Sequence, residues 1–212
     1  MHTEQALPAM RSSVRPAAGD GVAGNARLTG GAAALLLVLL AAEGLTIPLI
    51  GRLVGPHIFI GVLLIPPVAL KLASTGYRFA RYYAGHPPYR RKGPPPWAMR
   101  LLAPGVVATT LALFATGVWL AVEGPRNDAV VFLHKASFVA WFVLMGVHVL
   151  GHLLEVPRLA APDWRRAGGR DAALAGSGMR VSLLIASLLA GLIFALATLS
   201  LATPWVSTQV GG

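Results

Sequence analysis

Long apolar stretches constrain this chain more than any other feature of its sequence. Each is long enough to cross about 30 Å of hydrocarbon as a helix. They cover approximately residues 31–51, 57–77, 102–122, 130–154 and 181–203. Only 12% of the 212 residues are charged, whereas a soluble domain has about 25%. We therefore expect an all-α, polytopic helix bundle in a lipid bilayer, with five transmembrane helices.

The segments outside these stretches differ in composition. Residues 1–28 are rich in Ala, Gly, Ser and Arg and have no apolar period, which predicts a disordered cytoplasmic tail. The transmembrane domain is expected over 29–205, followed by a short external tail over 206–212. The proline-rich connection 84–98 is expected to be a stiff, extended loop. Residues 32–42 have the length of a signal-peptide core, but cleavage is not favoured because the apolar run resumes after Glu43.

The net charge of +10 is distributed unevenly along the chain. Fourteen of the 18 basic residues flank the predicted spans on one side, and only Arg52, Arg126 and Lys135 flank them on the other, with Lys71 inside a span. By the positive-inside rule, this bias predicts a cytoplasmic N-terminus and an external C-terminus. Membrane topology explains the basic residues, so we expect no nucleic-acid partner.

Histidines recur inside the apolar stretches with a regular spacing. His134 and His148 lie 14 residues apart on the fourth span, a separation that advances about 21 Å along a helix and returns to nearly the same face. The second span begins with His57 and has Lys71 14 residues later. Because spans two and four cross in the same direction, His57 should be level with His134 and Lys71 with His148. Imidazole suits iron, so one bis-histidine haem is expected between these spans near the outer face.

The inner pair leaves three interpretations open. A second haem could be held by His148 and Lys71, or by His152, or the inner position could hold no haem, which we favour. Lysine ligates metal only as a neutral amine. His148, His152 and Glu155 also have the spacing of a non-haem metal site on a helix end, although a histidine at a water interface needs no such role.

The histidine pattern resembles that of the di-haem membrane cytochromes b, in which two helices each carry two histidines about 14 residues apart. The stretches LLIPPVALKLASTGYRFARYY and LHKASFVAWFVLMGVHVLGHLLE are also similar to small bacterial cytochrome-b-like membrane proteins. The resemblance covers about 57–156 and departs from the pattern at Lys71. It implies a four-helix core, and haem b held by His57, His134 and, for a second haem, His148. It also implies electron transfer in a bacterial-type plasma membrane, as a subunit or partner of a membrane oxidoreductase or with a quinone.

Other residues have candidate roles around such a haem. The external cations Arg52, Arg126 and Lys135 are candidates for pairing with haem propionates, and Lys135 is preferred because it adjoins His134. Gly61 and Gly146 would leave room for a flat macrocycle, or serve helix packing.

Glu43 is an acid inside the first span. It is a candidate partner of Lys71 or a proton carrier beside a quinone. Two other functions remain open: a cofactor-free accessory membrane subunit, and a small proton-coupled transporter that uses Glu43, Lys71 and His148.

Overall fold

The computed structural model describes residues 20–94, 97–152, 158–159, 161 and 176–210, and these form helices and no strands. In chain order, the elements are α1 (Asp20–Thr46), the 3₁₀ turn η1 (Ile47–Leu49), α2 (Ile50–Tyr83), α3 (Pro87–Lys92), α4 (Trp97–Glu123), α5 (Asp128–His152), α7 (Ser177–Ala197), the 3₁₀ turn η3 (Leu199–Ala202) and α8 (Thr203–Val210). The all-α prediction is confirmed for this part of the chain.

Among the described residues, 4 helical stretches are long and apolar enough to cross a membrane. They are Gly21–Tyr83, which contains both α1 and α2, and Trp97–Glu123, Asp128–His152 and Ser177–Ala197. Large apolar side chains point outward from these helices: Leu101, Phe132 and Leu150 are 74%, 70% and 75% exposed. A soluble surface rarely exposes so much apolar area, whereas in lipid a helix satisfies its own backbone polar groups. The chain has the make-up of a multi-pass membrane protein.

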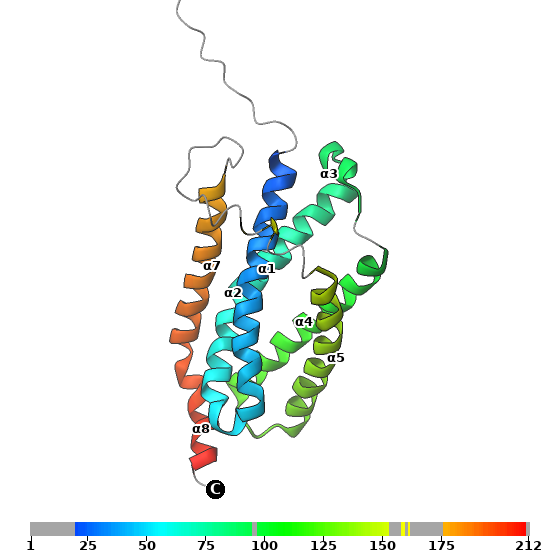
Figure 1. Ribbon diagram of the computed structural model, residues 1–212. Coiled ribbons are helices and arrows are strands. Elements are labelled where there is room, and N and C mark those ends of the chain that lie inside the picture. The colour runs from blue at the N-terminus through cyan, green and yellow to red at the C-terminus, as the bar shows by residue number, and fades with distance from the viewer. Residues whose placement is uncertain (1–19, 95–96, 153–157, 160, 162–175, 211–212) are drawn as a thin grey trace, which may run out of the picture.

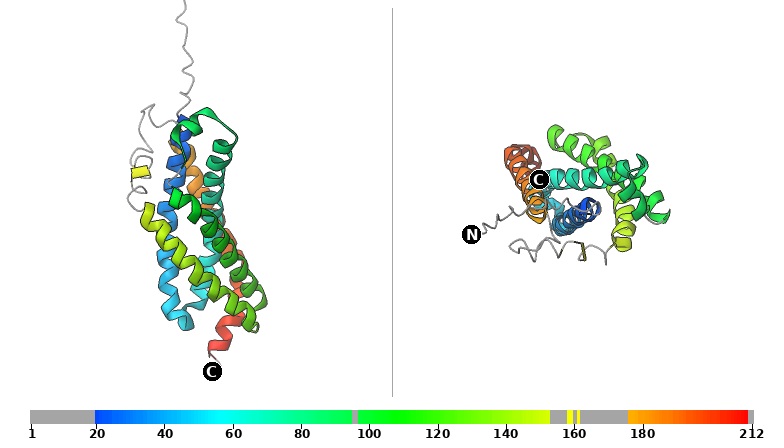
Figure 2. Two further views of the ribbon diagram at one scale, coloured as in Figure 1. Left: turned by 90° about the vertical axis from the view of Figure 1, so that its right-hand side faces the viewer. Right: turned by 90° about the horizontal axis from the view of Figure 1, so that it is seen from above.

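The helices form two groups that meet along α2 (Figures 1 and 2). In Figure 1, α1 descends from the top, the chain turns at η1, and α2 returns beside it, with α7 packed against α2 and more lightly against α1. The antiparallel hairpin of α4 and α5 contacts this group through α4 and α2. The beginnings of α1, α4 and α7 and the ends of α2 and α5 therefore lie at one end of the molecule, while η1, the α4–α5 turn and α8 lie at the other.

Helix α2 contains prolines in two places. Pro56 has no N–H to donate to the carbonyl of Arg52, and the non-helical residue within α2 is Leu53, at φ −114° and ψ 20°. Two further prolines, Pro66 and Pro67, lie near the middle of α2. Both of those residues remain within α2 at helical φ/ψ, since the only interruption of the helix is at Leu53. The break lies near the turn η1 between α1 and α2.

Gly191 allows α7 to approach α2 at the level of those prolines. A Cβ atom at position 191 would collide with the carbonyl oxygen of Leu63. That carbonyl lacks its usual helical donor because Pro67, four residues later, has no N–H. A close Cα–H contact from glycine partly compensates such an oxygen, and small residues let membrane helices pack closely. Leu64 of α2 and Ala195 of α7 are both buried.

Three segments differ from the sequence-based expectations. Residues 20–28 belong to α1 rather than to a disordered tail. Asn25 and Thr29 hydrogen-bond to Ser74 of α2 and fix this extension of the helix. Residues 1–19 lie outside the described part of the chain. The 84–98 connection is not extended throughout, since α3 forms with prolines in its first turn, where no N–H is needed. The expected external tail is mostly the helix α8, which contacts α2.

Candidate functional site

The rings of His57 and His134 lie together, one from the beginning of α2 and the other from the first half of α5. Their centroids are 6.4 Å apart and their planes are at 82°. Both side chains are partly buried. The sequence predicted that these two residues would be level although 77 residues separate them in the chain. The structure brings them to the same end of the helices, near η1 and the α4–α5 turn.

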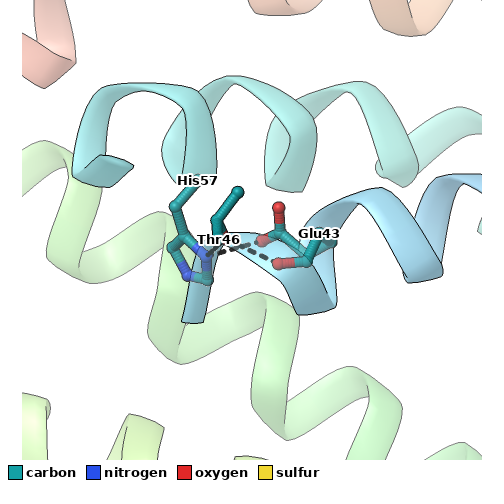
Figure 3. Close-up of polar contacts among 3 residues, drawn as sticks. All are labelled: Glu43, Thr46 and His57. Carbon is teal, nitrogen blue, oxygen red and sulfur yellow. Dashed lines mark hydrogen bonds and ion pairs between the residues drawn. The ribbon is translucent and has the colours of Figure 1, made fainter. Parts of the chain in front are cut away.

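The ring orientation of His57 is fixed by two residues of α1 (Figure 3). Its Nδ1 lies 2.9 Å from Thr46 Oγ1 and 3.0 Å from Glu43 Oε1. The Thr46 hydroxyl already donates to the backbone carbonyl of Glu43, at 2.6 Å, so its oxygen is left to accept. Carboxylate oxygens also accept. The neutral His57 ring therefore carries its proton on Nδ1 and a lone pair on Nε2.

A threonine of α4 holds His134 in the same way. Thr116 Oγ1 lies 3.0 Å from His134 Nδ1, and the hydroxyl donates to the carbonyl of Ala112 at 2.8 Å. Its oxygen is likewise an acceptor, so His134 is also the Nδ1–H tautomer with a lone pair on Nε2. Gly117 provides the space, because a Cβ there would lie only 3.1 Å from the His134 ring.

The donor set fits a haem better than a bare metal ion. No group of three or more His, Asp or Glu side chains in the described part of the chain is arranged to hold a metal. A haem supplies four nitrogen ligands itself and can take two more from the protein. With metal–imidazole bonds of about 2 Å, two rings on opposite sides of one iron have centroids about 6 Å apart. The observed 6.4 Å agrees with this separation.

The inner position is built differently. Lys71 Nζ donates to the carbonyl oxygen of Thr29 at 3.0 Å. The ring of His148 is 5.0 Å from that of His152, centroid to centroid. Its Nδ1 is buried and has no hydrogen-bond partner among the described residues. The amine of Lys71 is directed to α1, and the expected level placement of Lys71 with His148 stays a prediction. Glu155 of the alternative metal site lies outside the described residues.

The other candidates are placed as follows. Arg52, Arg126 and Lys135 are exposed. Glu43 contacts His57 and not Lys71, so the suggested Glu43–Lys71 pair is wrong. Gly61 faces Glu43, since a Cβ added at this glycine would lie 3.5 Å from Oε1, whereas Gly146 faces open space. Two surface hollows at the same end of the molecule, along α8 and beside the turn after α4, are not lined by any histidine.

Sequence reasoning missed Thr46, Thr116 and Gly117. A signal for the latter two was present, because α4 and α5 form a tight antiparallel hairpin around residues 124–127. Gly117 lies about as many residues before this turn as His134 lies after it. The antiparallel hairpin therefore places Gly117, and the adjacent Thr116, beside His134. The same count across the turn between α1 and α2 places Glu43 beside His57 only when the helix of α2 is taken to start after Leu53. The sequence does not reveal the break at Leu53.

The comparisons with known proteins add no relative to this picture. No family model matches the chain, and no curated protein or solved structure matches it. The geometry of the site is therefore the basis on which a function can be inferred.

Proposed function

We propose that this chain is a membrane b-type cytochrome that transfers electrons through one haem held between His57 and His134. The single observation that carries the proposal is the arrangement of these two rings. They come from different helices, their centroids are 6.4 Å apart, and each has its Nδ1 occupied by an accepting oxygen. Both Nε2 atoms are thereby left with lone pairs suited to iron.

The residues around the two histidines would perform distinct tasks. Thr46 and Glu43 orient His57, and Thr116 orients His134. Partners of this kind fix the tautomer and the ring orientation of metal-ligating histidines. Gly117 leaves the His134 ring free of contact with a side chain at that position of α4. The exposed cations Arg52 and Lys135 are the side chains we assign to the haem propionates, with Arg126 as a further candidate.

When bound, the haem supplies one-electron chemistry. The chain positions it between α2 and α5, and the electrons are exchanged with a partner oxidoreductase or a quinone. Lys71 provides no ligand in this proposal because its amine is hydrogen-bonded to Thr29. The protein then binds one haem.

The proposed topology has five crossings, because α1 and α2 lie antiparallel on either side of η1 (Figure 1). Their common helical stretch of 63 residues is too long for one crossing, which needs about 20 residues. We infer that the end carrying Arg78, Arg90 and Arg100 is cytoplasmic, by the positive-inside rule. The haem would then lie near the external face of a bacterial-type plasma membrane.

A reduced-minus-oxidised absorption spectrum of the purified protein tests this function. The proposal predicts the α-band of a low-spin b-type haem after dithionite reduction. A cofactor-free accessory subunit and a proton-coupled transporter both predict no such band, so its absence from protein expressed with adequate haem supply would overturn the proposal.

A further inference from the structure

The two histidines of the proposed haem site are held unequally. His134 Nδ1 has the neutral hydroxyl of Thr116 at 3.0 Å. His57 Nδ1 has a hydroxyl as well, from Thr46, but also the carboxylate of Glu43 at 3.0 Å. Figure 3 shows both oxygen atoms directed at the same ring nitrogen. The two histidines therefore differ in that only His57 has a carboxylate beside its Nδ1.

The carboxylate of Glu43 is largely buried. Its side chain is 15% exposed, and its Oε2 has no hydrogen-bond partner among the described residues. Within that part of the chain, the one ion-pair contact it makes is with His57, and Lys71 bonds to Thr29 instead. A buried carboxylate is costly unless a positive charge lies nearby.

We propose that Glu43 is a positioning residue that lowers the reduction potential of the haem by acting through His57; this inference rests on the proposed function. A carboxylate that accepts the Nδ1–H of a ligating histidine makes that histidine a stronger electron donor. Oxidised haem iron carries one more positive charge than reduced iron, so an adjacent buried anion stabilises the oxidised state more. Both effects favour the oxidised haem, and they act in the same direction on the potential.

Redox titration of Glu43→Gln tests the inference. The amide is nearly isosteric and its oxygen still accepts a hydrogen bond, so the low-spin spectrum should persist while the negative charge is lost. At the potential where the wild-type haem is half reduced, the ratio of reduced to oxidised haem should rise at least tenfold in the variant, equivalent to about +59 mV for one electron. Glu43→Asp, which retains the charge but shortens the reach, should shift the potential upward by less.

Glu123→Gln is the matched control. Glu123 is an exposed acid at the end of α4, where its Oε2 accepts from Asn127 at 3.1 Å. This substitution removes the same charge from the same side of the molecule and should leave the potential unchanged.

The outcomes separate this inference from the proposed function. A wild-type protein without haem overturns both. A wild-type protein with haem whose Glu43→Gln variant has an unchanged or lower potential overturns the role of Glu43 alone. If Glu43→Gln fails to retain haem, the Glu43→Asp titration decides, and an unchanged or lower potential in that variant overturns the inference.

Discussion

Lys71 Nζ donates a hydrogen bond of 3.0 Å to the backbone carbonyl of Thr29 and thereby joins α2 to α1. Ser74 and Asn25 extend the connection, since the amide of Asn25 donates to the carbonyl of Ser74 at 3.0 Å. In the sequence, Lys71 stands where a second histidine would complete a two-haem pattern. The contact that it makes at this position is with the backbone of α1.

Substitution of Lys71 by methionine should therefore leave haem content unchanged and reduce stability. A pyridine-haemochrome assay should give a haem-to-polypeptide ratio near one for both proteins. The free energy of unfolding should fall by about 1 kcal/mol, because the hydrogen bond from Lys71 to the Thr29 carbonyl is lost. The melting temperature in detergent measures this change. A ratio near two in the wild type would contradict the one-haem model, and loss of haem in Lys71→Met would then identify the amine as a ligand.

Gly191 should be intolerant of any side chain. Alanine there places a Cβ against the Leu63 carbonyl, so α7 must move away from α2, at a cost of about 1–3 kcal/mol. Thermal unfolding of the purified protein measures the loss. Gly146→Ala is the control, because that position faces open space and alanine favours a helix. Equal melting temperatures for the two variants would contradict the close contact of α2 and α7.

Gly117→Ala should weaken haem retention without preventing membrane insertion. The new Cβ would lie 3.1 Å from His134 Cε1, so the ring must shift from its hydrogen bond with Thr116. We expect the free energy of haem binding to weaken by about 1 kcal/mol, expressed as faster haem dissociation. This change corresponds to roughly fivefold faster transfer of haem to apomyoglobin. Gly76→Ala serves as the control, since nothing lies within 4 Å of its added Cβ. Identical transfer rates for both variants would argue against crowding at Gly117.

The orientation in the membrane can be tested with terminal reporters. With five crossings and the basic end inside, an alkaline phosphatase fused after Gly212 should be active in a bacterial host and a fluorescent protein fused before Met1 should be bright. The positive-inside rule gives this direction. Two termini on one side of the membrane would instead support an even number of crossings.

Much of this organisation was predictable from local sequence. Apolar length identified the helices, and the direction of each span predicted that His57 and His134 share a level, as their rings do. Whether they ligate haem stays a prediction. The contact between Glu43 and His57 was not predictable, because it depends on the break at Leu53 within α2, which the sequence does not reveal. The helical state of residues 20–28 depends on Ser74, which is distant in sequence.

The proposed haem ligation is tested most directly by the low-spin haem spectra of His57→Ala and His134→Ala. We expect the wild-type protein to have a reduced α-band and each variant to lose it, while membrane insertion and helical content by circular dichroism remain. His86→Ala, just before α3, should retain the band. A wild-type spectrum in both His57→Ala and His134→Ala would contradict the claim that these two residues hold the haem.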